Sequence, residues 1–219
     1  MTGPRRLDLH DLVRELCEET KHYEFYMRKL KAKHHVTVNP PLLVQLAAAS
    51  TPKASVEAGT LRPAGSKPSA AIEAIDALMR IDRDAAAWLR SLGEDDPGNV
   101  IQCVVSLAAL APQNRCARSK PQRDEHTKWV TCCRYHQIEV DVRRWWSWAR
   151  VVTRWDLPPW TPDNTCPLCG TRGSLRVRVV DRLAVCAEDE CRETWDETTI
   201  GLLADHIRAE NHEGEEQAS

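Results

Sequence analysis

The sequence of 219 residues lacks a long hydrophobic run and a visible secretion signal. Its longest apolar stretch, residues 103–111, is well short of the roughly 18 residues that a membrane-spanning helix needs. The first residues carry charges but no apolar segment behind them, which argues against a signal peptide. We therefore expect a soluble cytoplasmic protein with no membrane partner.

Sequence signatures of common enzymes are also missing. No GxGxxG or GxxxxGK[ST] segment is present to cradle phosphate groups, and no motif of a serine or cysteine nucleophile appears. Acidic groups such as residues 94–96 and 188–190 lie in turn-like segments, where solvation is their simplest role. The sequence thus predicts a protein that is not an enzyme and has no small-molecule substrate.

Cysteine and tryptophan, in contrast, are plentiful. The nine cysteines are an odd number, and without a secretion signal they favour metal binding over a disulfide framework. Eight tryptophans accompany a single phenylalanine, and five of them lie within residues 145–160. Charge is uneven: residues 115–156 carry a balance of +5, whereas residues 186–219 carry −9.

The spacing of apolar residues predicts a mainly α-helical protein with a small β-hairpin near the C-terminus. Helices are expected over residues 7–33, 39–49, 69–93 and about 123–155, with a buried helix or strand at residues 100–111. In the helix over 69–93 the expected buried stripe comprises Ile72, Ile75, Leu78, Met79, Ala86 and Leu89. In the helix over 123–155 a stripe of tryptophans recurs at steps of three and four. These tryptophans are more typical of a core, although aromatic rings also stack on unpaired bases.

The expected order of segments follows from these patterns and from composition. We divide the chain into a helical N-terminal region (1–49), a flexible linker (50–68), a helical bundle with the tryptophan-rich helix (69–158), a zinc ribbon with a final helix (159–210) and a disordered tail (211–219).

Four cysteines in two close pairs, Cys166, Cys169, Cys186 and Cys191, form the clearest motif. Sixteen residues, predicted to make a hairpin, separate the pairs and bring them together. Four thiolates favour Zn²⁺ in a closed tetrahedral site, which has no position for a reactive water and is therefore structural. Free thiols and an iron–sulfur cluster are the alternatives. The second pair departs from the usual ribbon, because four residues rather than two separate its cysteines.

A second group of ligand residues, Cys116, His126, Cys132, Cys133 and His136, has poor spacing for a metal. Cys132 and Cys133 would point about 100° apart on a helix, so one alone could join His136. A buried thiol and a surface histidine are the simpler interpretation.

The chain resembles an uncharacterised protein family encoded by actinobacteria and their phages, with a C-terminal four-cysteine zinc ribbon. The resemblance rests on the tryptophan- and cysteine-bearing residues 143–178 and on residues 191–213. The segments "PPLLVQL" and "AIDALMRIDRDAAAWLRSLG" extend it to the N-terminal half. It implies a phage or prophage context, and so a host-cell cytoplasm, but no established activity.

Two functions are expected from these features. The first is nucleic-acid binding or regulation, because arginines gather on the predicted hairpin and on the helix before it. These candidate residues are Arg172, Arg176, Arg178, Arg182, Arg143, Arg144, Arg150 and Arg154. The acidic C-terminal segment would repel a nucleic-acid backbone nearby. The alternative is therefore a module that binds a phage or host protein, with the zinc purely structural.

Overall fold

The computed structural model describes residues 7–28, 31–50, 69–116, 122–123, 129–130, 133–153 and 159–217. The helices are α1 (Leu9–Cys17), α2 (Leu42–Ser50), α3 (Ser69–Ser91), α4 (Val100–Leu110), the 3₁₀ turn η1 (Ala111–Asn114), α5 (Arg134–Thr153) and α6 (Ile200–Gln217). Short antiparallel sheets complete the fold, so the predicted mainly α-helical class is confirmed. Of the expected linker, residues 50–68, Ser50 is the last residue of α2 and residues 51–68 lie outside the described residues.

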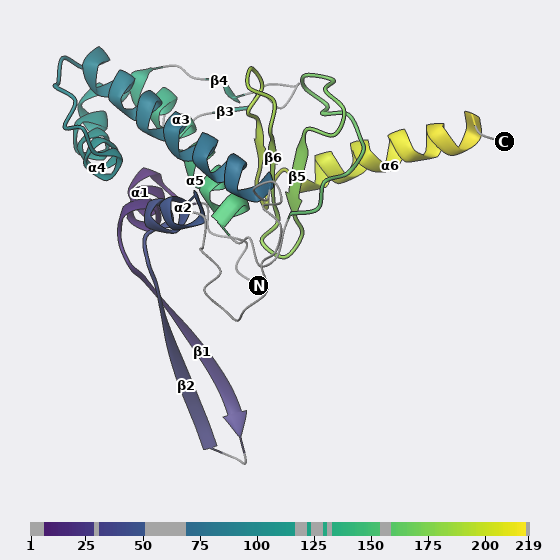
Figure 1. Ribbon diagram of the computed structural model, residues 1–219, viewed down its shortest axis with the longest axis horizontal. Helices are drawn as coiled ribbons and strands as arrows, with labels where there is room; N and C mark the ends of the chain where they lie inside the picture. Colours follow the sequence, from purple (N-terminus) through teal and green to yellow (C-terminus); the bar gives the residue numbers. More distant parts are fainter. Residues whose placement is uncertain are drawn as a thin grey trace, which may run out of the picture.

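Helices α1 to α5 form the main body around one hydrophobic core, and α5 contacts α1, α2 and α3 (Figure 1). Each helix contributes fully buried aliphatic side chains, among them Leu12, Leu46, Ile81, Leu107 and Ile138. Three tryptophans of α5, Trp145, Trp146 and Trp148, are buried in the same core. The interpretation of the tryptophan stripe as core is therefore confirmed for these positions.

A two-stranded arm replaces most of the helix predicted over residues 7–33. Helix α1 ends at Cys17, and strands β1 (Thr20–Arg28) and β2 (Lys31–Asn39) pair antiparallel over nine residues each. The prediction failed because apolar residues at helical spacing stop at Cys17. The following segment is rich in Thr, Tyr, Phe and Val, which favour strands. The arm projects away from the helical body (Figure 1).

Helix α3 is closed by Gly93, as expected, but its buried stripe differs from the predicted one. Gly93 has φ +85° and so follows the helix in the left-handed conformation that glycine adopts without strain. Ile72 and Met79, expected in the core, are 58% and 68% exposed. Ala86 and Leu89 are buried as expected, and Leu78 packs partly buried against the core. The rest of the core face carries Ile81 and the alanines Ala74, Ala77 and Ala85. Small side chains allow α2, α4 and α5 to pack closely against α3.

Helix α5 starts later than predicted. The segment before it forms a short antiparallel pair, β3 (Gln122–Arg123) with β4 (Trp129–Val130), so Trp129 lies in a strand. The segment of residues 100–111 is confirmed as a helix, capped by Asn99, whose side-chain oxygen accepts hydrogen bonds from the backbone of residues 101 and 102. Arg143, a candidate nucleic-acid contact in the sequence, is buried.

The C-terminal part contains the predicted hairpin and final helix. Strands β5 (Leu175–Arg178), β6 (Leu183–Cys186) and β7 (Thr194–Trp195) form an antiparallel sheet in the order β5-β6-β7. Helix α6 continues to Gln217, which corrects the expected disordered tail of residues 211–219 up to that position. Glutamates and glutamine dominate this stretch and are good helix formers.

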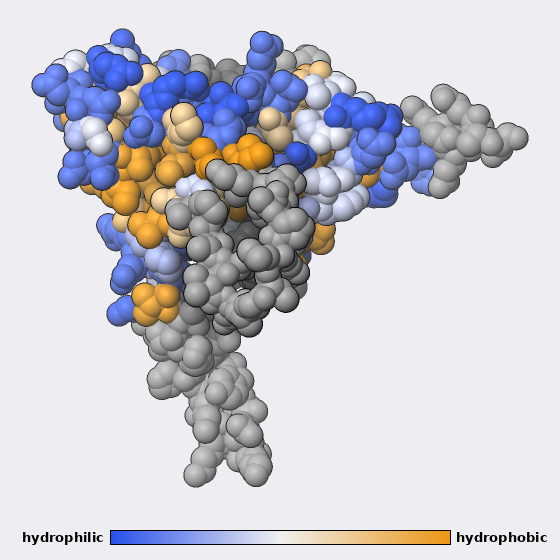
Figure 2. Space-filling view, viewed as in Figure 1, coloured by the Kyte–Doolittle hydropathy of each residue, from blue (hydrophilic) through white to orange (hydrophobic). Residues whose placement is uncertain are grey.

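The surface differs between parts of the molecule. In Figure 2 the upper edge and α6 are hydrophilic, whereas apolar residues are visible below α3, beside α2. Among the described helices, none combines the length and the apolar character needed to cross a membrane.

Candidate metal centre

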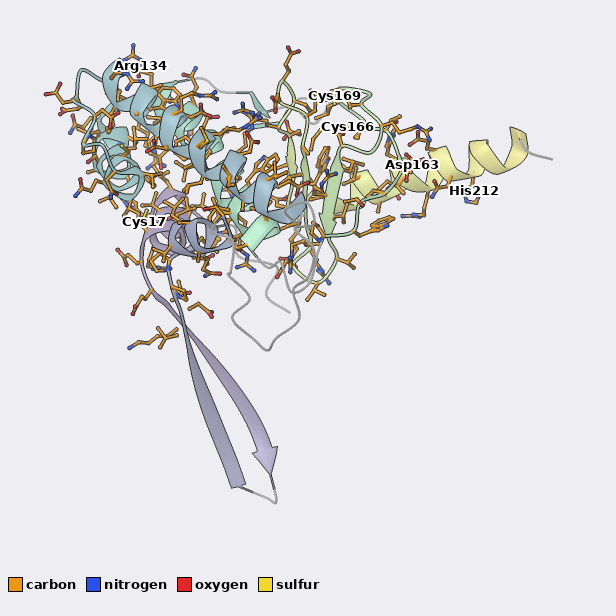
Figure 3. All side chains as sticks on the ribbon, viewed as in Figure 1. Cys17, Arg134, Asp163, Cys166, Cys169 and His212 are labelled. Carbon is orange, nitrogen blue, oxygen red and sulfur yellow. The ribbon has the colours of Figure 1, made fainter. Side chains whose placement is uncertain are left out.

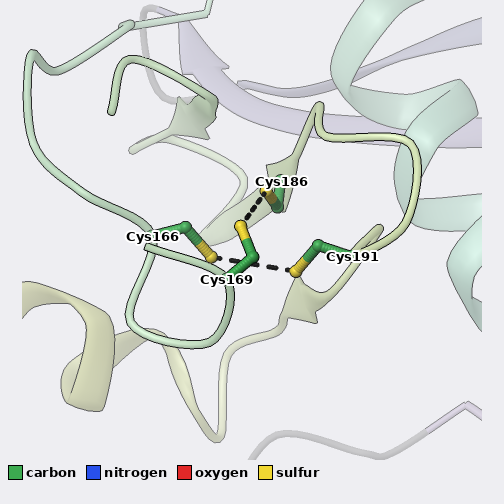
Figure 4. A group of neighbouring side chains, drawn as sticks. All are labelled: Cys166, Cys169, Cys186 and Cys191. Carbon is green, nitrogen blue, oxygen red and sulfur yellow. Dashed lines mark hydrogen bonds between the residues drawn. The ribbon is translucent and has the colours of Figure 1, made fainter. Parts of the chain in front are cut away.

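The four cysteines of the predicted site come together at the open end of the β5–β6 hairpin, where β5 begins and β6 ends (Figure 4). Cys166 and Cys169 lie in a turn before β5, where the Gly170 amide donates to the Cys166 carbonyl over 2.8 Å. Gly170 has φ +72°, which lets the chain reverse there. Cys186 ends β6 and Cys191 follows it in the next loop.

The distances between sulfurs suit a tetrahedral metal ion. Cys166 Sγ lies 3.8 Å from Cys191 Sγ, and Cys169 Sγ lies 3.8 Å from Cys186 Sγ. All four sulfurs lie within 4.8 Å of one another. Metal–sulfur bonds of about 2.3 Å in a tetrahedron place the sulfurs about 3.8 Å apart. The four residues could therefore hold a metal ion, and Cys166 and Cys186 are buried.

The sulfurs of the cluster shift one another's pKa values. Hydrogen bonds with Cys166 and Cys191 lower the pKa of Cys186, whereas hydrogen bonds with Cys166 and Cys186 raise the pKa of Cys191. The Ser174 hydroxyl lies 3.2 Å from Cys186 Sγ. A thiolate is the form that binds metal, and the direction of the pKa shift at Cys186 favours that form.

The unusually long second knuckle, residues 186–191, reaches the helical body. Asp189 forms an ion pair with Arg80 of α3, and the next turn of α3 pairs Asp84 with Arg192 over 3.2 Å. A cavity of about 240 Å³ lies between α3, α5 and this knuckle. Sequence reasoning missed this packing, although a signal was present in the two extra residues of the knuckle and in its three consecutive acids.

The four hairpin arginines, expected to contact nucleic acid, all pair with carboxylates of the same chain. Arg172 lies 3.3 Å from Asp163 and 3.5 Å from Glu210 of α6. Arg176 contacts Glu73 of α3 over 2.9 Å. Arg178 donates to Asp181 over 2.9 Å and is buried, and Arg182 contacts Glu197 over 2.8 Å.

The arginines of α5 are engaged in the same way. Arg143 is buried, donates to the Leu7 carbonyl over 2.7 Å and lies 3.5 Å from Glu139. Arg144 lies 3.3 Å from Asp141 and 3.7 Å from Glu193. Arg150 donates to Asp181 over 3.1 Å and lies over the Trp146 ring. Arg154 lies outside the described residues.

A comparison with known families matches the N-terminal part of the chain but not the part that carries the four cysteines. A family described as "Domain of unknown function (DUF7341)" matches residues 4–132, more than half of the chain. The chain belongs to this family. The matched region runs from α1 to the β3–β4 pair and includes the arm, whereas the four cysteines lie beyond it.

Neither a curated protein nor a solved structure matches the chain. The family itself is uncharacterised, and its match carries no information on source organism or metal. The actinobacterial and phage context therefore stays a prediction.

Proposed function

We propose that this chain is a non-enzymatic nucleic-acid-binding module of phage or prophage type, stabilised by a structural Zn²⁺. Cys166, Cys169, Cys186 and Cys191 would hold the zinc. Four sulfur donors with tetrahedral spacing suit zinc and leave no open coordination position, which supports a structural role. Zinc here would hold the hairpin in shape and supply no chemistry to a substrate.

The observation that carries the nucleic-acid proposal is the projecting arm, Thr20–Asn39. The arm contains five lysines and arginines against one glutamate, although the whole chain carries a net charge of −2. Nine residues per strand at about 3.4 Å each give the arm a length of about 30 Å. A basic two-stranded ribbon of this kind fits the major groove of double-stranded DNA.

The arm replaces the arginines of α5 and of the β5–β6 hairpin beside the four cysteines (the metal hairpin) as the proposed interface. Each described arginine of that set has a carboxylate of its own chain within 4.0 Å. A phosphate would have to displace those carboxylates, which weakens the support for an interface there. The arm also extends from the α1–α2 side of the helical body, away from the acidic helix α6 (Figure 1).

Binding across a salt series tests the proposal. We expect the chain to bind a double-stranded DNA probe at about 50 mM salt, and the affinity to fall steeply as salt rises. Replacing Lys21, Arg28, Lys31 and Lys33 by glutamine should lower the affinity and reduce the salt slope by about 0.9 for each phosphate that the variant no longer neutralises. Fluorescence anisotropy measures both quantities.

The matched control is the double variant Arg172→Gln/Arg182→Gln, which removes two exposed arginines of the metal hairpin. It should bind with an unchanged salt slope. A larger loss of affinity in this variant than in the arm variant would return the interface to the hairpin. Absence of binding to single- and double-stranded probes at about 50 mM salt would reject the proposal and leave the protein-interaction module as the alternative.

A further inference from the structure

A second cluster of metal-binding side chains lies at the start of α5, apart from the four cysteines. Cys116 follows η1, Cys133 immediately precedes α5, and His136 lies in the first turn of α5. The sequence predicted a surface histidine here, but His136 is fully buried. The other two residues of that pattern, His126 and Cys132, lie outside the described residues.

Both sulfurs converge on one nitrogen of the imidazole ring. Cys133 Sγ lies 3.4 Å and Cys116 Sγ lies 3.7 Å from His136 Nδ1, and the three ligand atoms lie within 4.8 Å of one another. A tetrahedral ion with metal–sulfur bonds of about 2.3 Å and metal–nitrogen bonds of about 2.0 Å separates sulfur from nitrogen by about 3.5 Å. The observed distances bracket this value.

Hydrogen bonding can explain one of the two sulfur–nitrogen contacts but not both. Nδ1 of an imidazole carries either one lone pair or one hydrogen, so it forms one good hydrogen bond in its ring plane. Two thiols directed at the same nitrogen are instead the arrangement of ligands around a shared cation. We propose that Cys116, Cys133 and His136 form a second metal site, which binds Zn²⁺ or another divalent cation that prefers sulfur and imidazole ligands.

Contacts between neighbouring segments hold the cluster in place. The Cys133 carbonyl accepts a hydrogen bond from the Gln137 amide over 3.1 Å, which places Cys133 at the N-terminal end of α5. Next to Cys116, the Arg115 guanidinium lies 5.0 Å from the centre of the Tyr135 ring. Adjacent residues of the η1 segment thus contact adjacent residues of α5.

A metal at this position would hold together Cys116 and Cys133, the two ends of the segment between η1 and α5. Sixteen residues separate Cys116 from Cys133, and their described part contributes the β3–β4 pair of two residues per strand. Metal binding supplies folding free energy to short segments that bury little apolar surface. This site therefore differs from the four-cysteine site in its elements and in its ligands, and its existence does not depend on nucleic-acid binding.

Metal stoichiometry of the full chain tests the proposal. After reconstitution of the metal-free protein with Zn²⁺ and removal of excess ion, elemental analysis should give two zinc ions per chain. The variants His136→Gln and Cys116→Ser should each give one. Cys17→Ser is the matched control and should keep two, because Cys17 belongs to neither cluster and lies in α1, away from Cys166 and Cys169 (Figure 3). Cys166→Ser/Cys169→Ser should keep one, which separates the two sites.

If a variant fails to fold, thiol alkylation of the wild-type chain tests whether the second site binds metal. With zinc bound, Cys116 and Cys133 should be protected, and a chelator should expose both to alkylation at least tenfold faster. Cys17 should react slowly throughout, because burial raises the pKa of its thiol to about 12. One zinc ion per wild-type chain, with alkylation of Cys116 and Cys133 unaffected by chelator, would overturn the proposal.

Discussion

At the scale of single residues, Asp181 shows how the arginines of the metal hairpin are held by their own chain. It lies in the β5–β6 turn and accepts hydrogen bonds from Arg178 over 2.9 Å and from Arg150 of α5 over 3.1 Å. The Asp181 side chain is 9% exposed and that of Arg178 is 5% exposed. A single carboxylate therefore bridges two guanidinium groups, one from the hairpin and one from the helical body.

Removing this charge should destabilise the protein strongly. Asp181→Asn leaves Arg178 buried without its counter-ion, and loss of one partner from a buried ion pair costs about 3–5 kcal/mol. Denaturant unfolding followed by tryptophan fluorescence measures the change. The control Asp205→Asn breaks an exposed pair with Arg208 and should cost less than about 1 kcal/mol. Equal effects of the two substitutions would show that Asp181 has no special role.

The sequence identified the cysteines but not the partners of the arginines. The two cysteine pairs can be recognised in the sequence because the members of each pair are only a few residues apart. The partner of Arg176 is Glu73, 103 positions earlier, and depends on how α3 packs against the hairpin. The burial of Arg143 was missed for the same reason, since its carbonyl acceptor belongs to Leu7, which is 136 positions earlier.

At the scale of elements, α3 shows the limit of hydrophobic periodicity. The predicted stripe and the core face share Ala86 and Leu89 at the C-terminal end of the helix, but towards its N-terminal end they diverge. There one face carries Ile72 and Met79, and the other carries alanines with Ile81. Hydrophobicity favours the first, but the second faces the core because α2, α4 and α5 surround it. Close packing of several helices selects small side chains, which a hydrophobicity scale ranks below isoleucine and methionine.

Paired substitutions in α3 distinguish the two stripes. Ile81→Ala should lower the free energy of unfolding by about 2–5 kcal/mol, because a fully buried aliphatic side chain leaves a cavity. Met79→Ala should change it by about 0.5 kcal/mol or less, since Met79 is exposed. Thermal or denaturant unfolding provides the comparison. The reverse order of costs would support the stripe expected from the sequence.

The β1–β2 arm shows a second limit of predicting elements from sequence patterns. Absence of Pro and Gly from residues 7–33 suggested one continuous helix, but it equally permits strands. What decided the structure is the composition after Cys17, together with a partner strand that supplies nine residue pairs. Strand pairing is a contact between separate segments, so a pattern within one segment predicts it less well than it predicts a helix.

At the scale of the whole molecule, β6 joins the two hydrophobic cores. All four of its residues are buried. Leu183 and Val185 contribute to the core of the helical body, whereas Ala184 and Cys186 contribute to a smaller core with Trp195. Alternation of side chains along a strand explains this division. The sulfur cluster therefore lies one residue away from the main core, at the strand that both parts share.

A metal held by the four cysteines would support the smaller core. Among the described residues that core contains eight buried ones, two of them cysteines of the candidate metal site. Apolar burial of this size stabilises a segment weakly, so the metal should supply much of its folding free energy. Helices α3 and α4 bury their apolar residues in the larger core and do not depend on it.

Hydrogen exchange with and without a metal chelator tests this account most directly. Removal of the metal should increase amide exchange at least tenfold over residues 160–210, which include β5, β6 and β7. Exchange in α3 and α4 should change less than about twofold. Unchanged protection over residues 160–210 after complete metal removal, or loss of protection along the entire chain, would contradict the account.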